Sequence, residues 1–297
     1  MNKTQHQFGG SWTDEKLERV RKYLVAYAKI MNKQRFRFAY IDAFAGTGYR
    51  ATKNNADQDG LKFPEFSDKE TKEFLEGSVR IALKIKPRFT KYFFIEKDQS
   101  RFSELEKLKD EFPQVSSDIV LVNSDANSYL KDLCENRRWD KNRAVLFLDP
   151  YGMQVSWKTV AAIASTKAID LWYLFPLGAV NRMLTKNGKI TSAWRAKLDK
   201  ILGTTEWYDL FYKSGEEVDL LGSRPVVKKI GDFDSIGKFF VDRLKTLFPG
   251  VAENPYPLVN SKGSHLYLLC FAASNPKGAT TAIKIAQDIL KRRSDGN

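Results

Sequence analysis

The sequence has few of the residues that bind metals or act as catalytic nucleophiles. Its 297 residues include only two cysteines, Cys134 and Cys270, and two histidines, His6 and His265. The cysteines form no CxxC or other metal-ligand spacing, so a zinc site or a histidine-based nucleophile system lacks parts. We therefore expect no metal centre, and ordinary thiols in a reducing compartment.

Long apolar runs are also missing. No run approaches the ~20 residues that a membrane-spanning helix needs. Residues 1–12 are polar and lack the apolar h-region of a secretory signal. We expect no membrane association and a cytoplasmic location.

Hydrophobic and basic residues are abundant. Hydrophobic residues make up 42% and aromatic residues 13% of the chain, which is enough for a large folded core. Lysine and arginine number 49 against 36 acids, giving a formal charge of +13. Such an excess indicates a polyanionic partner, with nucleic acid ahead of membrane.

The apolar pattern predicts an α/β protein with a Rossmann-like, mostly parallel sheet. An amphipathic helix from Thr13 precedes apolar runs that are mostly separated by enough chain for a helix. The last two runs predict an antiparallel hairpin added to the sheet. The runs are 38–41, 92–95, 119–122, 145–148, 171–175, 256–259 and 265–272.

This pattern also predicts the domain organisation. Residues 1–36 form an N-terminal helical segment, and 37–176 with 255–297 form the sheet domain. The region 177–254 is too long for a simple crossover, and we expect a helical insertion beside the site.

A glycine loop follows the first predicted strand. Asp42 is followed by Ala43, Phe44, Ala45, Gly46, Thr47 and Gly48, so the backbone at the two glycines can approach a ligand closely. A carboxylate at Asp42 repels a pyrophosphate and attracts an ammonium or sulfonium group. The loop therefore favours S-adenosylmethionine over a dinucleotide. The alternative is a strand that ends in an ordinary glycine turn.

Three more acids follow successive predicted strands. Glu96 is placed to bind ribose hydroxyls, or is a solvated acid; Asp125 is placed to contact adenine, or caps the next helix. The fourth strand ends in Asp149-Pro150-Tyr151-Gly152, which also suits a type I turn. Since carboxyl ends of parallel strands meet at one edge, we expect one site.

The fourth motif suggests a reaction. Methyl transfer to an exocyclic amine of a nucleobase needs acceptors for its N–H groups, which Asp149 and the Pro150 carbonyl offer. Tyr151 offers a ring on which a base can stack. Arg182, among the basic and aromatic residues of 177–254, belongs to a possible phosphate-binding surface; aromatic side chains such as Trp194 and Trp207 are alternatively core residues.

Several motifs together resemble the three-Cys-motif partner proteins, a family similar to class I S-adenosylmethionine-dependent methyltransferases. The resemblance covers nearly the whole chain. It rests on Phe8-Gly9-Gly10-Ser11-Trp12-Thr13-Asp14-Glu15-Lys16-Leu17, Ile41 to Gly48, Glu76-Gly77-Ser78, Phe147 to Gly152 and the closing hairpin.

The resemblance implies a class I methyltransferase fold with a seven-stranded sheet, and a partner protein that carries the three cysteine motifs. The Asp149-Pro150-Tyr151-Gly152 motif is similar to Asp-Pro-Pro-Tyr of amino-directed adenine methyltransferases and to Asp-Pro-Phe-Gly of guanine 2-amino enzymes. It lacks the second proline of the former. We therefore expect methylation of a nucleobase amino group in RNA or DNA, with substrate contacts at Tyr151, Gly152 and Arg182. The alternatives are a partner-binding module without catalysis and a small-molecule methyltransferase.

Overall fold

The computed structural model describes residues 11–46, 77–219, 222–260 and 262–291. Thr47 and Gly48 of the predicted cofactor loop lie outside the described residues, as do Phe8 to Gly10 of the N-terminal motif.

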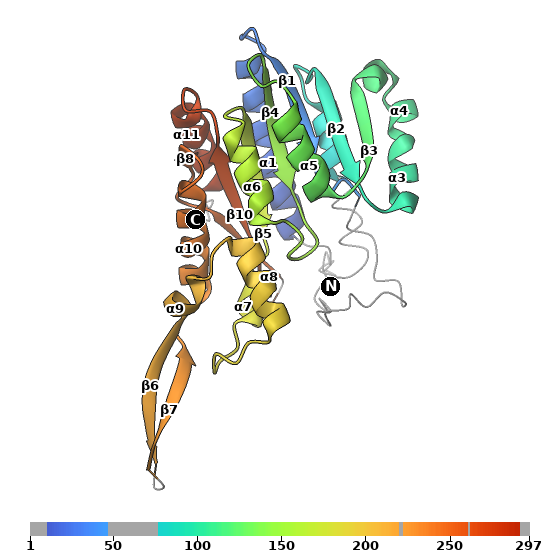
Figure 1. Ribbon diagram of the computed structural model, residues 1–297. Coiled ribbons are helices and arrows are strands. Elements are labelled where there is room, and N and C mark those ends of the chain that lie inside the picture. The colour runs from blue at the N-terminus through green and yellow to red at the C-terminus, as the bar shows by residue number, and fades with distance from the viewer. Residues whose placement is uncertain (1–10, 47–76, 220–221, 261, 292–297) are drawn as a thin grey trace, which may run out of the picture.

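One large sheet forms the centre of the molecule (Figure 1). Its main path runs β3-β2-β1-β4-β5-β10-β8, and β9 pairs with β10. The strands β1 to β5 are mutually parallel, whereas β10 is antiparallel to β5, β8 and β9. The predicted fold class is confirmed, with the short β8 as an eighth strand that the sequence did not predict. The strands are β1 (Arg37–Asp42), β2 (Lys91–Glu96), β3 (Ile119–Asn123), β4 (Asn142–Leu148), β5 (Ile169–Phe175), β8 (Gly250–Val251), β9 (Tyr256–Val259) and β10 (His265–Ala273).

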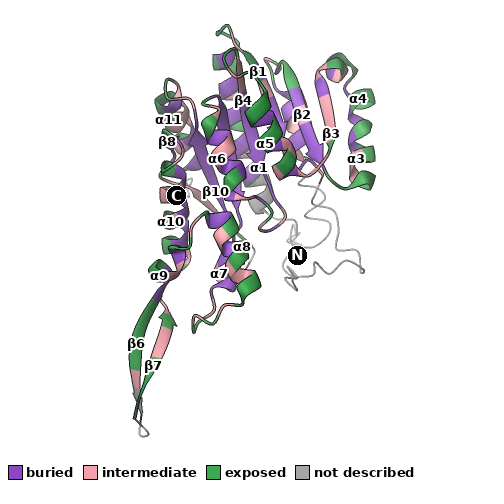
Figure 2. Ribbon diagram, in the orientation of Figure 1, coloured by how far each residue is buried: buried purple, intermediate pink, exposed green. Residues whose placement is uncertain are grey.

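Helices cover both faces of the sheet, and each face has its own apolar core. One face packs against α1 (Ser11–Met31), the helix of residues 77–84, α3 (Gln99–Glu106), α4 (Leu108–Glu111), the 3-10 turn η1 (Pro113–Asp118) and α11 (Ala279–Leu290). The other packs against α5 (Ala126–Asn136), α6 (Trp157–Ser165), α7 (Leu177–Met183), α8 (Ser192–Leu202), α9 (Trp207–Phe211) and α10 (Phe233–Lys245). The strands between them are largely buried (Figure 2), because a parallel sheet with helices on both faces has no solvent side.

The region 177–254 is not wholly helical. It contains α7 to α10, but also an antiparallel ribbon of β6 (Tyr212–Asp219) and β7 (Gly222–Lys229), which projects from the body of the molecule (Figure 1). Its last strand, β8, pairs with β10 and so belongs to the main sheet. The ribbon strands carry no sustained alternating apolar pattern, because among their described residues only Tyr212 and Val227 pack against the core. Trp207 is fully buried and its indole N–H donates to Asp199, as expected of a core residue.

Gly203 ends α8 in the left-handed conformation, with φ +70°. A Cβ at this position would lie 2.0 Å from the Trp157 ring. We expect Gly203→Ala to lower the free energy of unfolding by about 2–4 kcal/mol, because the strained backbone and the overpacking both act on the folded state. Urea denaturation measures this loss. Gly215→Ala is the control, because a Cβ there has no atom within 4 Å; equal losses for both variants would contradict the prediction.

Asp170 of β5 is a buried carboxyl group that accepts a 2.6 Å hydrogen bond from the Tyr23 hydroxyl of α1. Burial raises the pKa of Asp170 to about 7. The native state therefore holds a proton that the unfolded chain has lost, and this contribution to stability disappears as the pH rises through 7.

We expect Asp170→Asn to reduce the loss of stability between pH 5 and pH 8 by about 2–3 kcal/mol. The asparagine carbonyl still accepts from Tyr23 but does not titrate. Denaturation at a series of pH values measures the effect, with the exposed Asp209→Asn of α9 as control. Parallel stability curves for wild type and Asp170→Asn would show that Asp170 does not titrate in this range.

Candidate functional site

A buried ion pair lies just beyond β4. Asp149 follows the last residue of this strand, and the Lys16 ammonium of α1 lies 3.4 Å from both of its carboxylate oxygens. The two side chains are only 8% and 1% exposed. The first helix of the chain thus delivers a cation to the carboxyl edge of the sheet.

Asp42 ends β1 next to this pair and is equally buried. Its carboxylate accepts hydrogen bonds from the Ser78 hydroxyl at 2.9 Å, the Tyr40 hydroxyl at 3.2 Å and the Phe44 backbone N–H at 3.3 Å. These bonds come from its own strand, the loop after it and the helix of residues 77–84. Asp42 is therefore an acid held in a fixed orientation.

Burial sets the protonation of this cluster, which we call the Lys16 cluster: Lys16, Asp42 and Asp149. The pKa of Asp42 rises to about 7, mainly because burial desolvates its carboxylate; the Ser78 hydrogen bond lowers this pKa and the nearby Asp149 raises it. Desolvation also raises the pKa of Asp149, whereas Lys16 lowers it. The pKa of Lys16 falls to about 7 because burial outweighs the attraction of Asp149. A low-dielectric site with shifted pKa values of both signs is typical of a functional site.

Glu96 and Gly46 meet at the ends of β2 and of the loop after β1. The Glu96 carboxylate is buried, and one oxygen, Oε1, accepts the Asp98 backbone N–H at 2.7 Å. Its other oxygen, Oε2, has no hydrogen-bond partner among the described residues. A Cβ on Gly46 would lie 2.9 Å from this Oε2. The structure therefore brings together two residues that the sequence placed in one cofactor site, and leaves one acceptor of Glu96 for a ligand hydroxyl.

Asp125 caps α5, which is the alternative that its sequence allowed. Its side chain accepts the Ser128 backbone N–H at 3.1 Å. The end of β3 is nevertheless tied to the end of β2, because the Asn123 side-chain amide donates to the Glu96 carbonyl at 2.9 Å. A contact from Asp125 to adenine stays a prediction.

The residues after Asp149 lie against β10. The buried Tyr267 hydroxyl of β10 accepts the Gly152 backbone N–H, and the charges of Asp149 and Arg182 act on it. Burial raises the pKa of Tyr267, with Asp149 and Tyr151 adding to the rise, whereas Arg182 lowers it. Pro150 is buried, Tyr151 is half-buried and Gly152 has φ +74°. The structure thus gathers Tyr151, Gly152 and Arg182 around one hydroxyl group.

Sequence reasoning missed three residues here: Lys16, Ser78 and Tyr267. A signal existed for Lys16, because it lies one turn before Val20, on the stripe of α1 that continues through Leu24 and Tyr27 into the core. A lysine on the apolar stripe of a helix either has a buried charged partner or shows that the helix has been assigned the wrong buried face. Tyr267 had no such signal, since a tyrosine in a strand is ordinary.

No group of three or more potential metal ligands occurs in the described part of the chain. Among the same residues, none of the helices has the length and apolar character that a membrane span requires.

No protein-family model matches the chain, and no curated protein matches it. Solved structures with a similar arrangement include protein LPL1258 from Legionella pneumophila, with 13% identity, a TM-score of 0.46 and coverage of 95% of this chain and 92% of that one. A putative S-adenosylmethionine-dependent methyltransferase from Listeria monocytogenes has 9% identity, a TM-score of 0.38 and coverage of 86% and 98%. A putative methylase, HI0767 from Haemophilus influenzae, has 14% identity, a TM-score of 0.32 and coverage of 74% and 99%.

Proposed function

We propose that this protein is an S-adenosylmethionine-dependent methyltransferase that acts on an exocyclic amino group of a nucleobase in RNA or DNA. The observation that carries the proposal is the Lys16 cluster, buried at the carboxyl edge of a mostly parallel sheet beside Glu96 and Gly46. Ligands of open α/β sheets bind at this edge.

The residues present fit the cofactor. The unpartnered Glu96 Oε2 offers an acceptor to a ribose hydroxyl, and Gly46 leaves space beside it that any side chain would fill. Phe44 and Ala45 form the described part of the loop, and we propose that Asp42 attracts the cationic methionine end. When bound, S-adenosylmethionine supplies an electrophilic methyl group on a sulfonium sulfur.

Asp149 is the residue that we propose to act on the acceptor amine. Its carboxylate accepts an amine N–H, which favours a pyramidal nitrogen whose lone pair can attack the methyl group. Transfer would form the N–C bond as the bond between the methyl carbon and the sulfonium sulfur breaks, with S-adenosylhomocysteine as the leaving group, and water would take up the proton that the amine loses. Lys16 favours the ionised form of Asp149 and counteracts the burial that raises the pKa of this carboxyl group, because an ammonium at 3.4 Å stabilises a carboxylate in a low-dielectric site. We propose that the half-buried Tyr151 stacks on the base.

The substrate class rests on charge and position. The formal charge of +13 suits a polyanion, and Arg182 lies next to the segment after Asp149. A three-Cys-motif partner protein and a cytoplasmic location complete the proposal. The ribbon β6-β7 offers exposed backbone away from the sheet for contact with such a partner.

The proposal is tested in two steps. Calorimetry with S-adenosylmethionine and S-adenosylhomocysteine measures cofactor binding, and Glu96→Ala is expected to weaken it at least about tenfold by removing a buried charged acceptor. Transfer of a labelled methyl group to total RNA and DNA then measures activity. Cofactor binding without transfer would favour the binding module, and transfer only to small molecules would overturn the nucleic-acid substrate.

A further inference from the structure

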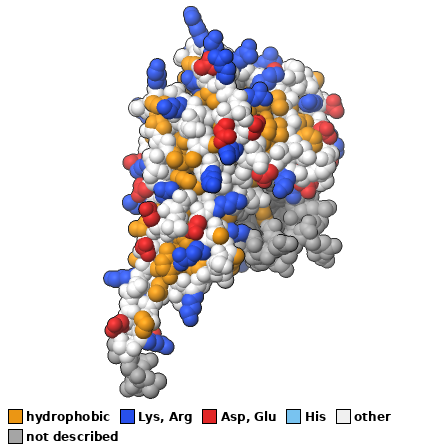
Figure 3. Space-filling model, viewed as in Figure 1, with side chains coloured by type: hydrophobic (Ala, Val, Ile, Leu, Met, Phe, Trp, Pro, Cys, Tyr) orange, Lys and Arg blue, Asp and Glu red, His pale blue; other side chains and the backbone are white. Residues whose placement is uncertain are grey.

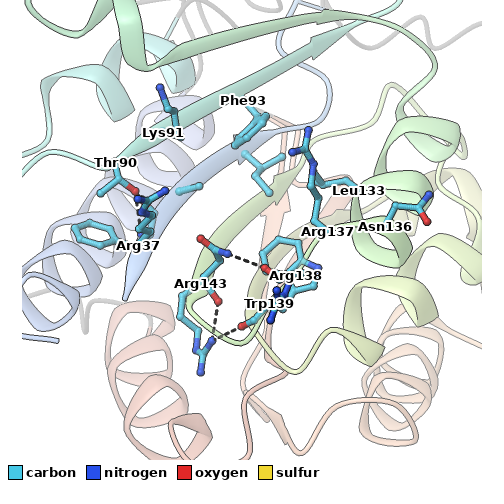
Figure 4. Close-up of a pocket in the computed structure, with 14 residues that line it drawn as sticks. Arg37, Thr90, Lys91, Phe93, Leu133, Asn136, Arg137, Arg138, Trp139 and Arg143 are labelled. Carbon is cyan, nitrogen blue, oxygen red and sulfur yellow. Dashed lines mark hydrogen bonds between the residues drawn. The ribbon is translucent and has the colours of Figure 1, made fainter. Parts of the chain in front are cut away.

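A pocket lies at the edge of the sheet opposite the Lys16 cluster, where β1, β2 and β4 begin (Figure 4). Its volume is about 620 Å³, which is in the range of small-molecule sites. Its floor is apolar and includes Ala39, Ile41, Phe93 and Leu133. Its rim is basic and carries Arg37, Lys91, Arg137, Arg138 and Arg143. We call it the basic pocket.

The charge of the basic pocket is only partly neutralised. None of the described residues that line it is an aspartate or a glutamate. Lys91 pairs with Asp118 at 3.3 Å and Arg138 with Asp140 at 3.7 Å, both outside the lining. The exposed Arg37 and Arg137 make no ion pair within the part of the chain that the structure describes. Cations gathered in this way repel one another, and a bound anion removes that repulsion.

One of these cations is fixed in place. The Arg143 guanidinium stacks 4.0 Å from the centre of the Phe36 ring, and its Nη1 donates to the carbonyls of Trp139 and Asn142 at 2.8 and 2.7 Å. Figure 4 shows both bonds. Its Nε is buried and has no partner among the described residues. At least one cation of the basic pocket is therefore held in a fixed position by its contacts with the protein.

The surface around the basic pocket also has basic side chains at the end where the strands begin and apolar side chains beside them. On the face shown in Figure 3, lysine and arginine side chains gather at the end of the molecule where the parallel strands begin, and hydrophobic side chains lie over β2 and β3. Phe93 of β2 is half-buried in the pocket because no helix covers it fully.

We propose that the basic pocket binds a nucleotide, with its planar base on the apolar floor beside Phe93 and its phosphate at the arginine rim. An aromatic ring offers stacking to any base, and guanidinium groups bind phosphate oxygens through paired hydrogen bonds. The nucleotide is either a free nucleoside phosphate or an unstacked residue of a nucleic-acid strand, since both present the same ring and phosphate. This inference does not rest on the proposed methyl transfer, because the two sites lie at opposite ends of the strands.

Binding measurements on the full chain test the proposal. The probes are AMP, inorganic phosphate and a short fluorescein-labelled single-stranded RNA, each at low salt. We expect Arg37→Ala/Arg137→Ala to weaken AMP or RNA binding at least about tenfold. Phe93→Leu, which keeps an apolar side chain but removes the ring, should weaken AMP binding and leave phosphate binding unchanged.

The matched control is Lys84→Ala/Lys109→Ala, which removes two exposed charges from the helices on the other face of the sheet. AMP binding would support a free nucleotide as the ligand, and binding of RNA alone would support a nucleic-acid strand. In both cases the arginine double variant must weaken binding and the lysine double variant must leave it unchanged. Equal losses in the two double variants, or phosphate binding as tight as AMP binding, would overturn the proposal.

Discussion

Replacement of Asp149 by asparagine should lower kcat for methyl transfer by about 10²–10³-fold while leaving cofactor affinity almost unchanged. The carboxylate is the acceptor that we place at the amine, and an amide holds an N–H more weakly and carries no charge. Loss of one such preorganised group costs on the order of 10²–10³ in kcat, or about 3–4 kcal/mol. Steady-state transfer assays measure the loss, and calorimetry should find the Kd for S-adenosylmethionine within about threefold of wild type, since three-fold is well under 1 kcal/mol.

A second variant separates chemistry from folding. Asp149→Asn removes the carboxylate that lies 3.4 Å from the Lys16 ammonium, which is 1% exposed, and breaking a buried pair costs about 3–5 kcal/mol unless the lysine loses its proton. Lys16→Met/Asp149→Asn removes both charges, so stability should recover while transfer stays low. If cofactor binding disappears together with transfer in both variants, Asp149 belongs to the cofactor site and not to the acceptor amine.

The sheet could be predicted from the sequence because its strands are continuous apolar runs. Ile169 to Phe175 of β5 are all buried. An apolar run of this kind identifies a strand from its own residues, without knowledge of the strand with which it pairs. The hairpin of β9 and β10 was visible for the same reason, with Asn260 and Gly263 between its strands. The ribbon β6-β7 was not visible, because segments such as Lys213 to Glu217 are stabilised by strand pairing and not by burial.

The candidate site could be predicted only in part. Its acids follow strands, and strand order alone brings Asp42, Glu96 and Asp149 to one edge. The counter-charge comes from Lys16, 133 positions before Asp149 in the chain, and no local pattern specifies such a contact. The contact between Lys16 and Asp149 depends on the direction in which α1 crosses the sheet, and α1 is held in that direction by its packing against β9 and α11.

Lys16→Met should also abolish most of the transfer at neutral pH, but for a reason that pH can reveal. Without the ammonium, Asp149 keeps its burial, which raises the pKa of its carboxyl group, and loses the charge that lowers it. A protonated Asp149 cannot hold the amine N–H as a charged acceptor. The activity of Lys16→Met should therefore return in part as the pH rises and Asp149 ionises, so its profile shifts to higher pH than that of wild type.

The pH profile distinguishes this role from mere support of the fold. A lysine that only anchors α1 would, when replaced, lower stability and activity equally at every pH. The control is Lys22→Met on the same helix, whose ammonium is exposed and lies 3.7 Å from Glu18; its profile should match wild type, because exposed pairs contribute less than about 1 kcal/mol. An unshifted profile for Lys16→Met would contradict the proposed role, since the ionisation of Asp149 would then not depend on Lys16. A shifted profile, together with loss of transfer in Asp149→Asn at every pH, would place the essential ionisation on the Asp149 carboxylate.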